Sequence, residues 1–177
     1  MSDLAAPFSL SRPTVRGYVT LLERLFLAAE LPAWHANHLK RLVKTPKLHT
    51  GDTGFTAALL HASAEDLFED RTLFSRLLKT FVHNELVRLA SFSETPTRFS
   101  HWRDYDGLEV DVVLERGRRV AGVEVKAAGT VTAKDFRGLR TLQDALGDRF
   151  ACGVVLYDGE SCVPFGERLW AVPIGAL

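Results

Sequence analysis

Two strand-like runs joined by a short connection constrain the fold of this 177-residue chain more than any other feature. Residues 108–115 and 119–127 alternate apolar and charged side chains, and the sequence ERGRR links them. Gly117 suits the first central position of a two-residue type II′ turn, which makes the two runs antiparallel neighbours. Such a turn pairs Arg116 with Arg119 and thereby sets the register of the whole hairpin.

That register brings four charged side chains to one face of the hairpin. Counting outward from the turn, Asp111 lies opposite Glu124, and Glu109 lies opposite Lys126. Because strand side chains alternate between faces, these four share a face. The other face is expected to join a core and consists of Leu108, Val110, Val112, Leu114, Val123 and Val125.

The opposed carboxylates indicate a cation site. Side chains directly opposite on neighbouring strands have Cβ atoms about 4.5–5.5 Å apart, and like charges at that distance repel. Carboxylate oxygens suit Mg²⁺ or Mn²⁺, so we expect Asp111 and Glu124 to hold one of these ions. Lys126 would then orient or deprotonate an attacking water, or stabilise a transition state. Alternatively, Glu109 pairs with Lys126, and the other two carboxylates are solvated at a surface.

Glu85 offers a third carboxylate. It interrupts the apolar stripe of a helix expected over 71–90, and an acid in such a stripe is costly to bury unless it is paired. One reading directs Glu85 at the same metal ion. The other places it at the edge of the stripe, where it reaches water or bonds Arg88 one turn later.

The remaining apolar periodicity defines the fold class. Helical spacing recurs over 71–90 and 132–146, and strand-like runs recur over 98–103 and 150–157, with a further edge strand expected over 169–174. With the hairpin, the order is α-β-β-β-α-β. Long apolar strands in that order predict an α/β layered domain, which we assign to residues 51–177.

Residues 1–50 differ in charge and pattern. They carry a net charge of +4, whereas residues 51–177 carry −4 and the whole chain is neutral. A helix capped by Ser11 and two short strands ending near Leu31 and His49 have the outline of an incomplete winged helix. We expect its basic side chains to bind nucleic-acid phosphates: Arg12, Arg16, Arg24, Lys40, Arg41, Lys44 and Lys47.

The carboxylate pattern resembles a known superfamily. A helix Glu followed by Asp-x12-Glu-x-Lys, here Glu85, Asp111, Glu124 and Lys126, is similar to the PD-(D/E)xK nuclease-like motif, although Val110 stands where that motif often has Pro. The wider text, including SRPTVRGYVTLLERLFLAAELPAW, KTPKLHTGDTG, FVHNELVRLA, HWRDYDGLEVDVVLE and GVEVKAAGTVTAKDFRGLR, resembles the C-terminal region of bacterial AAA+ ATPases that carry the domain of unknown function 4143.

The resemblance implies a restriction-endonuclease-like fold, a winged-helix-like flank and a preceding ATPase module. This chain has no G-x-x-x-x-G-K-[ST] segment, so no ATP site of that kind is expected in it, and a C-terminal fragment is inferred. The leading hypothesis is a Mg²⁺-dependent nuclease that acts on DNA or RNA. The alternative is a non-catalytic DNA-binding or protein-interaction module that regulates a partner ATPase.

The remaining expectations concern location and single residues. No apolar run reaches a membrane span and no signal pattern opens the chain, so a cytoplasmic protein without membrane contact is expected, with a homodimer formed through the apolar N-terminal helix. Trp34 and Trp102 either stack on bases or fill a core. His49, His83 and His101 are read as isolated residues, with His83 on the polar side of its helix.

Overall fold

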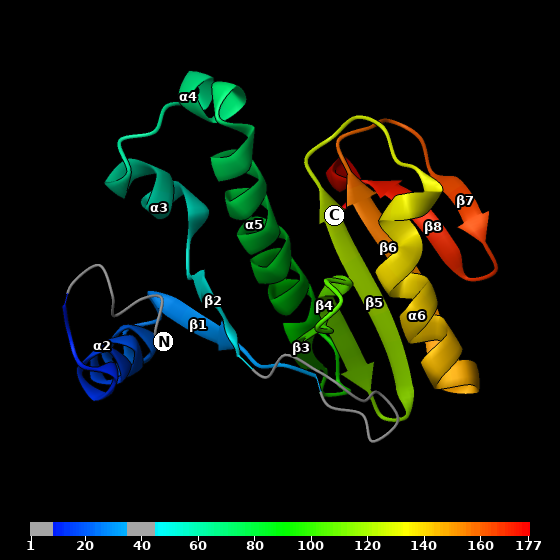
Figure 1. The fold of residues 1–177 in the computed structure, drawn as a ribbon, viewed down its shortest axis with the longest axis horizontal. Coiled ribbons are helices and arrows are strands. Elements are labelled where there is room, and N and C mark those ends of the chain that lie inside the picture. Colours follow the sequence, from blue (N-terminus) through cyan, green and yellow to red (C-terminus); the bar gives the residue numbers. More distant parts are fainter. Residues whose placement is uncertain (1–8, 35–44) are drawn as a thin grey trace.

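A six-stranded mixed sheet forms the centre of the molecule (Figure 1). The computed structural model describes residues 9–34 and 45–177. The strand order is β3-β4-β5-β6-β8-β7, with β5, β6 and β8 parallel and the other neighbours antiparallel. The strands span β3 Arg98–Arg103, β4 Glu109–Arg116, β5 Arg119–Lys126, β6 Phe150–Tyr157, β7 Val163–Gly166 and β8 Leu169–Pro173.

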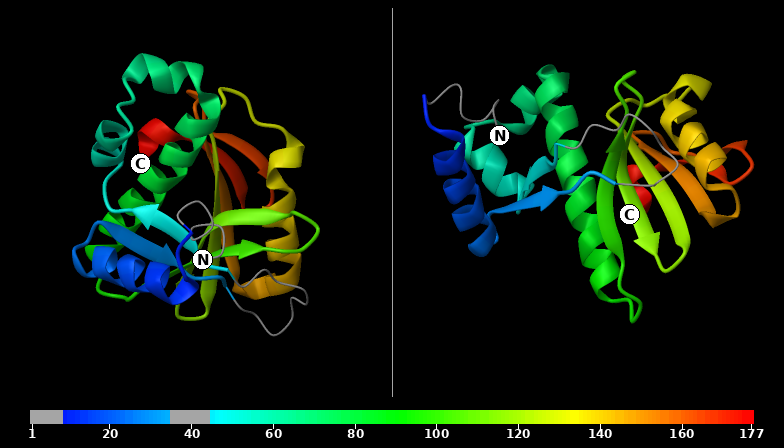
Figure 2. Two further views of the ribbon diagram at one scale, coloured as in Figure 1. Left: turned by 60° about the vertical axis from the view of Figure 1, so that its left-hand side comes forward. Right: turned by 60° about the horizontal axis from the view of Figure 1, so that its bottom comes forward.

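Helices cover both faces of this sheet, so the mixed α/β class is confirmed (Figure 2). Helix α5, Arg71–Ser91, packs through Leu78, Val82 and Leu86 on one face. The opposite face carries α6, Arg137–Leu146, which opens with the 3₁₀ turn η2, Ala133–Phe136. Short 3₁₀ turns η3, Gly147–Arg149, and η4, Ile174–Ala176, complete this part of the chain.

The hairpin register is confirmed from the turn as far as Val112. Arg116 pairs with Arg119, and the ladder continues without a shift to Val112 opposite Val123. Gly117 has a φ of 60° and Arg118 is not among the residues with positive φ, which agrees with the expected type II′ turn.

The expected apolar face of the hairpin is wrong at two positions, Leu108 and Val110, which both pack in the layer beneath α6. Val112 lies in the layer beneath α5, but Val110 belongs to the cluster beneath α6. The reason is a bulge: Ser100 pairs with Val113, whereas Trp102 pairs with Val110, so β4 has one more residue than β3 between the two pairs. A bulge re-aims the side chains on its strand, and here it includes Asp111. The expected common face of the four charged side chains is therefore wrong for Asp111, which reaches Lys79 of α5, whereas Glu124 and Lys126 lie on the α6 side.

The C-terminal strands differ from expectation in position. Residues 169–174 were expected at an edge, but β8 lies inside the sheet between β6 and β7. The sequence reading missed β7, a four-residue strand that contains Pro164. Short strands with Pro are typical of sheet edges, because Pro cannot donate to a ladder.

The N-terminal elements lie beside α5 and β3 (Figures 1 and 2). Helix α2, Arg12–Arg24, begins at the expected cap Ser11, and β1, Ala28–Leu31, pairs antiparallel with β2, Lys47–Thr50. Short helices α3, Thr53–Leu59, and α4, Ala64–Glu69, lead into α5. Ala33 bridges to His101 beside the outer edge of β3.

Both tryptophans that were considered for base stacking belong to the core. Trp34 is 6% exposed and Trp102 is 1% exposed. Trp34 donates its indole N–H to Glu115 at 3.1 Å, which fixes the ring between the N-terminal segment and the sheet. Neither ring has a face available to a base.

No helix among the described residues is long and apolar enough to cross a membrane.

Candidate metal centre

Three carboxylates lie close together at the end of the β4–β5 hairpin that is farther from its turn. Glu109, Asp111 and Glu124 each offer an oxygen, and these atoms all lie within 4.8 Å of one another. Side chains replace the backbone ladder here: the Asp111 N–H donates to Glu124 Oε2 at 3.3 Å, and the Val125 N–H donates to Asp111 Oδ2 at 3.1 Å. The cluster is thus built into the hairpin rather than displayed on a mobile loop.

Two lysines hold Asp111 in its ionised form. Asp111 Oδ1 accepts from Lys47 Nζ and from Lys79 Nζ, each at 2.9 Å. Burial alone would raise the pKa of Asp111, but the two ammonium groups outweigh it and lower the pKa below its ordinary value. In turn, the pKa of Lys79 is raised: burial opposes its charge, and Asp111 more than compensates.

Glu124 is the carboxylate of the cluster whose ionisation is least favourable. It is 5% exposed, and burial together with the charge of Asp111 raises its pKa from 4.5 to about 8. Glu124 therefore carries a proton at neutral pH when no metal ion is bound. A divalent ion would have to displace that proton.

Lys126 stands at the other side of Glu124. Its Nζ lies 3.8 Å from Glu124 Oε1 and 3.4 Å from Asp135 Oδ1. Slight burial would raise the pKa of Asp135, but hydrogen bonds from Thr132 and the Lys126 charge lower it. Asp135 thus stays ionised and keeps the ammonium group beside the carboxylates.

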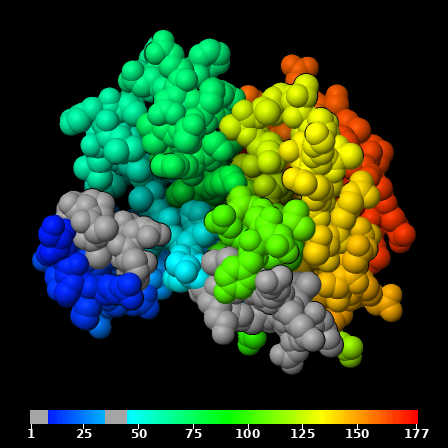
Figure 3. Space-filling view, viewed as in Figure 1, coloured from blue at the N-terminus to red at the C-terminus, as the bar shows by residue number. Residues whose placement is uncertain are grey.

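Two cavities flank the cluster and share Glu109. One, of about 430 Å³, lies on the α5 side and includes Lys47, Arg76, Lys79 and Asp111. The other, of about 170 Å³, lies on the α6 side and is lined by Glu109 and Glu124 together with three cations, Lys126, Lys134 and Arg137. In the space-filling view, β2 (cyan) reaches the surface between the green atoms of α5 and of the segment before β4 (Figure 3).

Glu85 does not join these carboxylates. Its carboxylate forms an ion pair with Arg88 one turn later, as in the second of its two readings. Lys79 is the α5 residue that reaches the cluster. The backbone of Glu85 lies about 9 Å beyond that of Lys79 along the helix axis. Glu109 supplies the third carboxylate in its place.

The seven basic residues assigned to nucleic acid fall into three groups. Lys47 contacts Asp111, and Arg16 forms an ion pair with Glu30, so both already have acidic partners. Arg12 and Arg24 lie on the exposed surface of α2. Lys40, Arg41 and Lys44 lie outside the described residues.

Histidines that were read as isolated form a buried pair. His49 and His83 stack with ring centroids 4.4 Å apart, and they are 7% and 5% exposed. His83 was expected on a polar helix face, but β2 covers that face, where Asn84 also donates to the Thr50 carbonyl. His101 is buried too, and its Nε2 contacts the Thr45 carbonyl at 3.0 Å.

This pair should make the fold sensitive to acid. Burial, with help from His83 and Lys47, lowers the pKa of His49 from 6.5 to about 3, so the folded state excludes a proton that the unfolded chain binds below pH 6.5. Stability present above pH 6.5 is therefore lost as pH falls, by about 2 kcal/mol at pH 5 for this residue. Urea unfolding at pH 7.5 and 5 should show that loss in the wild type and less of it in His49→Phe.

The exposed His61 provides the matched control for this prediction. His61→Gln should keep the acid sensitivity of the wild type. An equal loss of stability in wild type and His49→Phe would mean that His49 is not the acid-sensitive group.

Sequence reasoning missed Lys79 and Asp135. Lys79 lies three and four residues before the buried Val82 and His83, so a lysine on the packed side of a helix was the available signal. Asp135 was visible as the last member of the Thr132-x-x-Asp135 capping box. Its contact with Lys126 depends on how α6 docks on the sheet, which no local pattern gives.

The fold and the site define a mixed α/β domain, and comparison with known proteins gives its family. Residues 74–177 match the family described as "Domain of unknown function (DUF4143)", and the chain belongs to it. Residues 1–66 match "Domain of unknown function (DUF8612)". No solved structure matches the chain.

Two mycobacterial proteins are similar over nearly the whole chain. They are uncharacterized protein Rv2008c of Mycobacterium tuberculosis and uncharacterized protein Mb2031c of Mycobacterium bovis, each 27% identical over 173 residues. The match covers 97% of this chain but only 37% of each relative.

Proposed function

We propose that the chain is a nuclease-like domain that hydrolyses phosphodiester bonds with Mg²⁺ or Mn²⁺. The observation that carries this proposal is the cluster of Glu109, Asp111 and Glu124, whose oxygens lie within 4.8 Å of one another beside Lys126. The hairpin and the flanking helices are compatible with a restriction-endonuclease-like core. The α2-β1-β2 segment would serve as a winged-helix-like flank.

The donor set fits a hard divalent ion. All three groups are carboxylates, the ligand class of Mg²⁺ and Mn²⁺, and burial with the charge of Asp111 raises the pKa of one of them, Glu124. When bound, the ion would polarise a phosphoryl oxygen and lower the pKa of water. Asp111 Oδ1 would have to exchange Lys47 or Lys79 for the metal, which frees an ammonium group for the substrate.

Lys126 is the residue of this chain best placed to act on the phosphate. Its ammonium group is partly exposed, lies at the rim of the α6-side cavity and is oriented by Asp135. From there it would donate to a phosphoryl oxygen as negative charge develops, or hold the attacking water. Glu124, once deprotonated, would act as a ligand rather than as a base.

A specific observation also favours a second candidate. Lys47, Lys79 and Lys126 lie within 4 Å of these carboxylates, and Glu124 can be neutralised by its own proton, so the cluster needs no metal for its charges to be compensated. Such a balanced ion-pair network would suit a non-catalytic DNA-binding or protein-interaction module. The chain spans 37% of the length of these relatives, and the ATPase module that the sequence resemblance implies for the same polypeptide belongs to this proposal as well.

One experiment separates the two candidates. The purified chain is incubated with plasmid, linear DNA and RNA in Mg²⁺, in Mn²⁺ and in EDTA, and Mn²⁺ binding is measured by calorimetry on the same preparation. The nuclease proposal expects cleavage that requires metal and is lost in Asp111→Asn. Absence of both cleavage and metal binding would reject the nuclease proposal and favour the second candidate, the non-catalytic module with an ion-pair network.

The cavities beside the cluster should contribute phosphate contacts. Arg76, Lys134 and Arg137 line them without an acidic partner in the described part of the chain. We expect Arg76→Gln and Arg137→Gln each to weaken binding of a labelled DNA strand several-fold in Ca²⁺ and to reduce the salt slope by about 1. Fluorescence anisotropy over a series of salt concentrations measures both quantities.

Arg140→Gln is the matched control for these variants. Arg140 lies one turn after Arg137 on the same helix but donates to the Phe165 carbonyl, away from the cavity. If all three substitutions weaken binding equally, the arginines act only through the overall charge of the protein, and specific phosphate contacts are rejected.

A further inference from the structure

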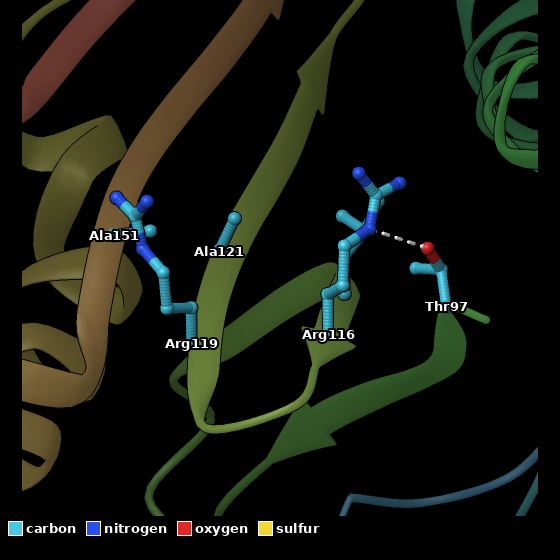
Figure 4. Close-up of a pocket in the computed structure, with 6 residues that line it drawn as sticks. Thr97, Arg116, Arg119, Ala121 and Ala151 are labelled. Atoms are coloured by element: carbon cyan, nitrogen blue, oxygen red, sulfur yellow. Dashed lines mark hydrogen bonds between the residues drawn. The ribbon is translucent and has the colours of Figure 1, made fainter. Parts of the chain in front are cut away.

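A separate cavity of about 320 Å³ lies at the turn end of the β4–β5 hairpin, at the opposite end of β4 from the carboxylates. Figure 4 shows Arg116 and Arg119 extending on either side of Ala121, with Ala151 beside Arg119. Thr97 and Leu114 complete the lining. Nothing in the proposed nuclease chemistry uses these residues, so the cavity needs an explanation of its own.

The two arginines form a like-charged pair. They are register partners across the turn, and like charges directly opposite on neighbouring strands repel. Arg116 Nε donates to Thr97 Oγ1 at 3.0 Å, which orients the guanidinium and leaves its two terminal nitrogens without a hydrogen bond or ion pair to any described residue. No described acid pairs with Arg119. Glu115, next in sequence, contacts Trp34 and Arg149 instead.

The floor between the arginines is apolar. Leu114 belongs to the apolar layer that packs beneath α5, and Ala121 and Ala151 continue that surface on β5 and β6. No residue of α5 lines this cavity. Two small side chains at the floor leave the volume that larger residues would fill.

We propose that this cavity binds a carboxylate attached to a small apolar group. The carboxylate would lie between the two guanidinium groups, which match its planar geometry and offset their mutual repulsion. The apolar part would rest on Leu114, Ala121 and Ala151. A volume of about 320 Å³ is at the lower end of ligand pockets, which favours a compact ligand.

Such a group occurs on free organic acids and on the carboxyl terminus of a polypeptide that ends in an apolar residue. Titrations followed by NMR and by thermal unfolding should distinguish them, using acetate, hexanoate, hexanol, and a short peptide ending in Leu as the free acid or the amide. We expect hexanoate to bind at least tenfold more tightly than acetate, and hexanol not to bind. The free-acid peptide binds more tightly than hexanoate only if the carboxyl terminus of a polypeptide is the ligand.

Substitutions test the assignment to this cavity. Arg116→Gln and Arg119→Gln should each weaken hexanoate binding at least fivefold, and Ala121→Leu should abolish it by filling the floor while the circular dichroism spectrum stays native. Arg118→Gln, in the same turn but outside the lining, is the control. Equal affinity for acetate and hexanoate, or binding indifferent to all three variants, overturns the proposal.

A nucleic-acid contact would give a different pattern. In that case Arg116→Gln and Arg119→Gln weaken salt-sensitive DNA binding, Ala121→Leu does not, and no carboxylate binds. That pattern also overturns the proposal. Because the cavity is remote from Asp111, loss of hexanoate binding and loss of metal-dependent cleavage are independent results.

Discussion

Replacing Lys126 by Gln should lower the rate of metal-dependent cleavage by about 10²–10³-fold, the loss typical of one positioned donor or proton-transfer group. Lys126 Nζ lies 3.8 Å from Glu124 and 3.4 Å from Asp135, at the rim of a cavity large enough for a phosphate group. Gln keeps a polar, hydrogen-bonding side chain but removes its charge. Single-turnover cleavage with saturating enzyme measures the chemical step apart from binding.

Two further measurements make the result specific. Mn²⁺ binding to Lys126→Gln should be at least as tight as in the wild type, since the lost ammonium group is a competitor for the carboxylates rather than a ligand. Arg118→Gln, at the far end of the same hairpin, should cleave at the wild-type rate. A Lys126→Gln protein that retains full cleavage would remove this lysine from the chemistry and leave it as a partner of Glu124 and Asp135.

Asp135 should act on cleavage through Lys126. It is 3.4 Å from the ammonium group and is itself held by Thr132. Asp135→Asn is expected to lower the rate less than Lys126→Gln does, and to add little in the double variant. Near-additive losses would instead mean that Asp135 has a role of its own.

The turn chemistry explains why the centre of the site was predictable. Gly117 fixes a two-residue turn, and counting outward from it brings Asp111 and Glu124 to the same level of the hairpin. The period of two fails at the bulge, so Asp111 lines the α5-side cavity and Glu124 the α6-side cavity. The third carboxylate could not be chosen in the same way, because Glu85 and Glu109 are both within plausible reach until the docking of α5 is known.

Long-range packing decided what the sequence left open. Lys47 and Lys79 lie 64 and 32 residues from Asp111, and they meet it only because β2 and α5 dock against the hairpin. The same docking covers His83, which a single helix projection places on a polar side. The β4 bulge likewise depends on pairing with β3. No local pattern predicts it, and for that reason Val110 was assigned to the wrong face.

Glu124→Gln should make the metal-free protein more stable than the wild type in alkali and nearly equal to it in mild acid. The pKa of Glu124 is raised from 4.5 to about 8, so the folded wild type holds a proton that the unfolded chain has already released. The resulting stability is fully present below pH 4.5 and is lost as pH rises through 8. Between pH 5 and 9 the loss amounts to up to about 4 kcal/mol.

Urea unfolding in EDTA at pH 5, 7 and 9 measures this difference, because Gln keeps the shape of the side chain without its charge. Adding Mg²⁺ at pH 9 should restore stability to the wild type, where the ion binds the ionised carboxylates, and should do little for Glu124→Gln. If the stability of the two proteins changes in parallel from pH 5 to 9, Glu124 is already ionised at neutral pH. The lysines around Asp111 would then suffice to neutralise the cluster, and the argument for a metal ion would lose its electrostatic basis.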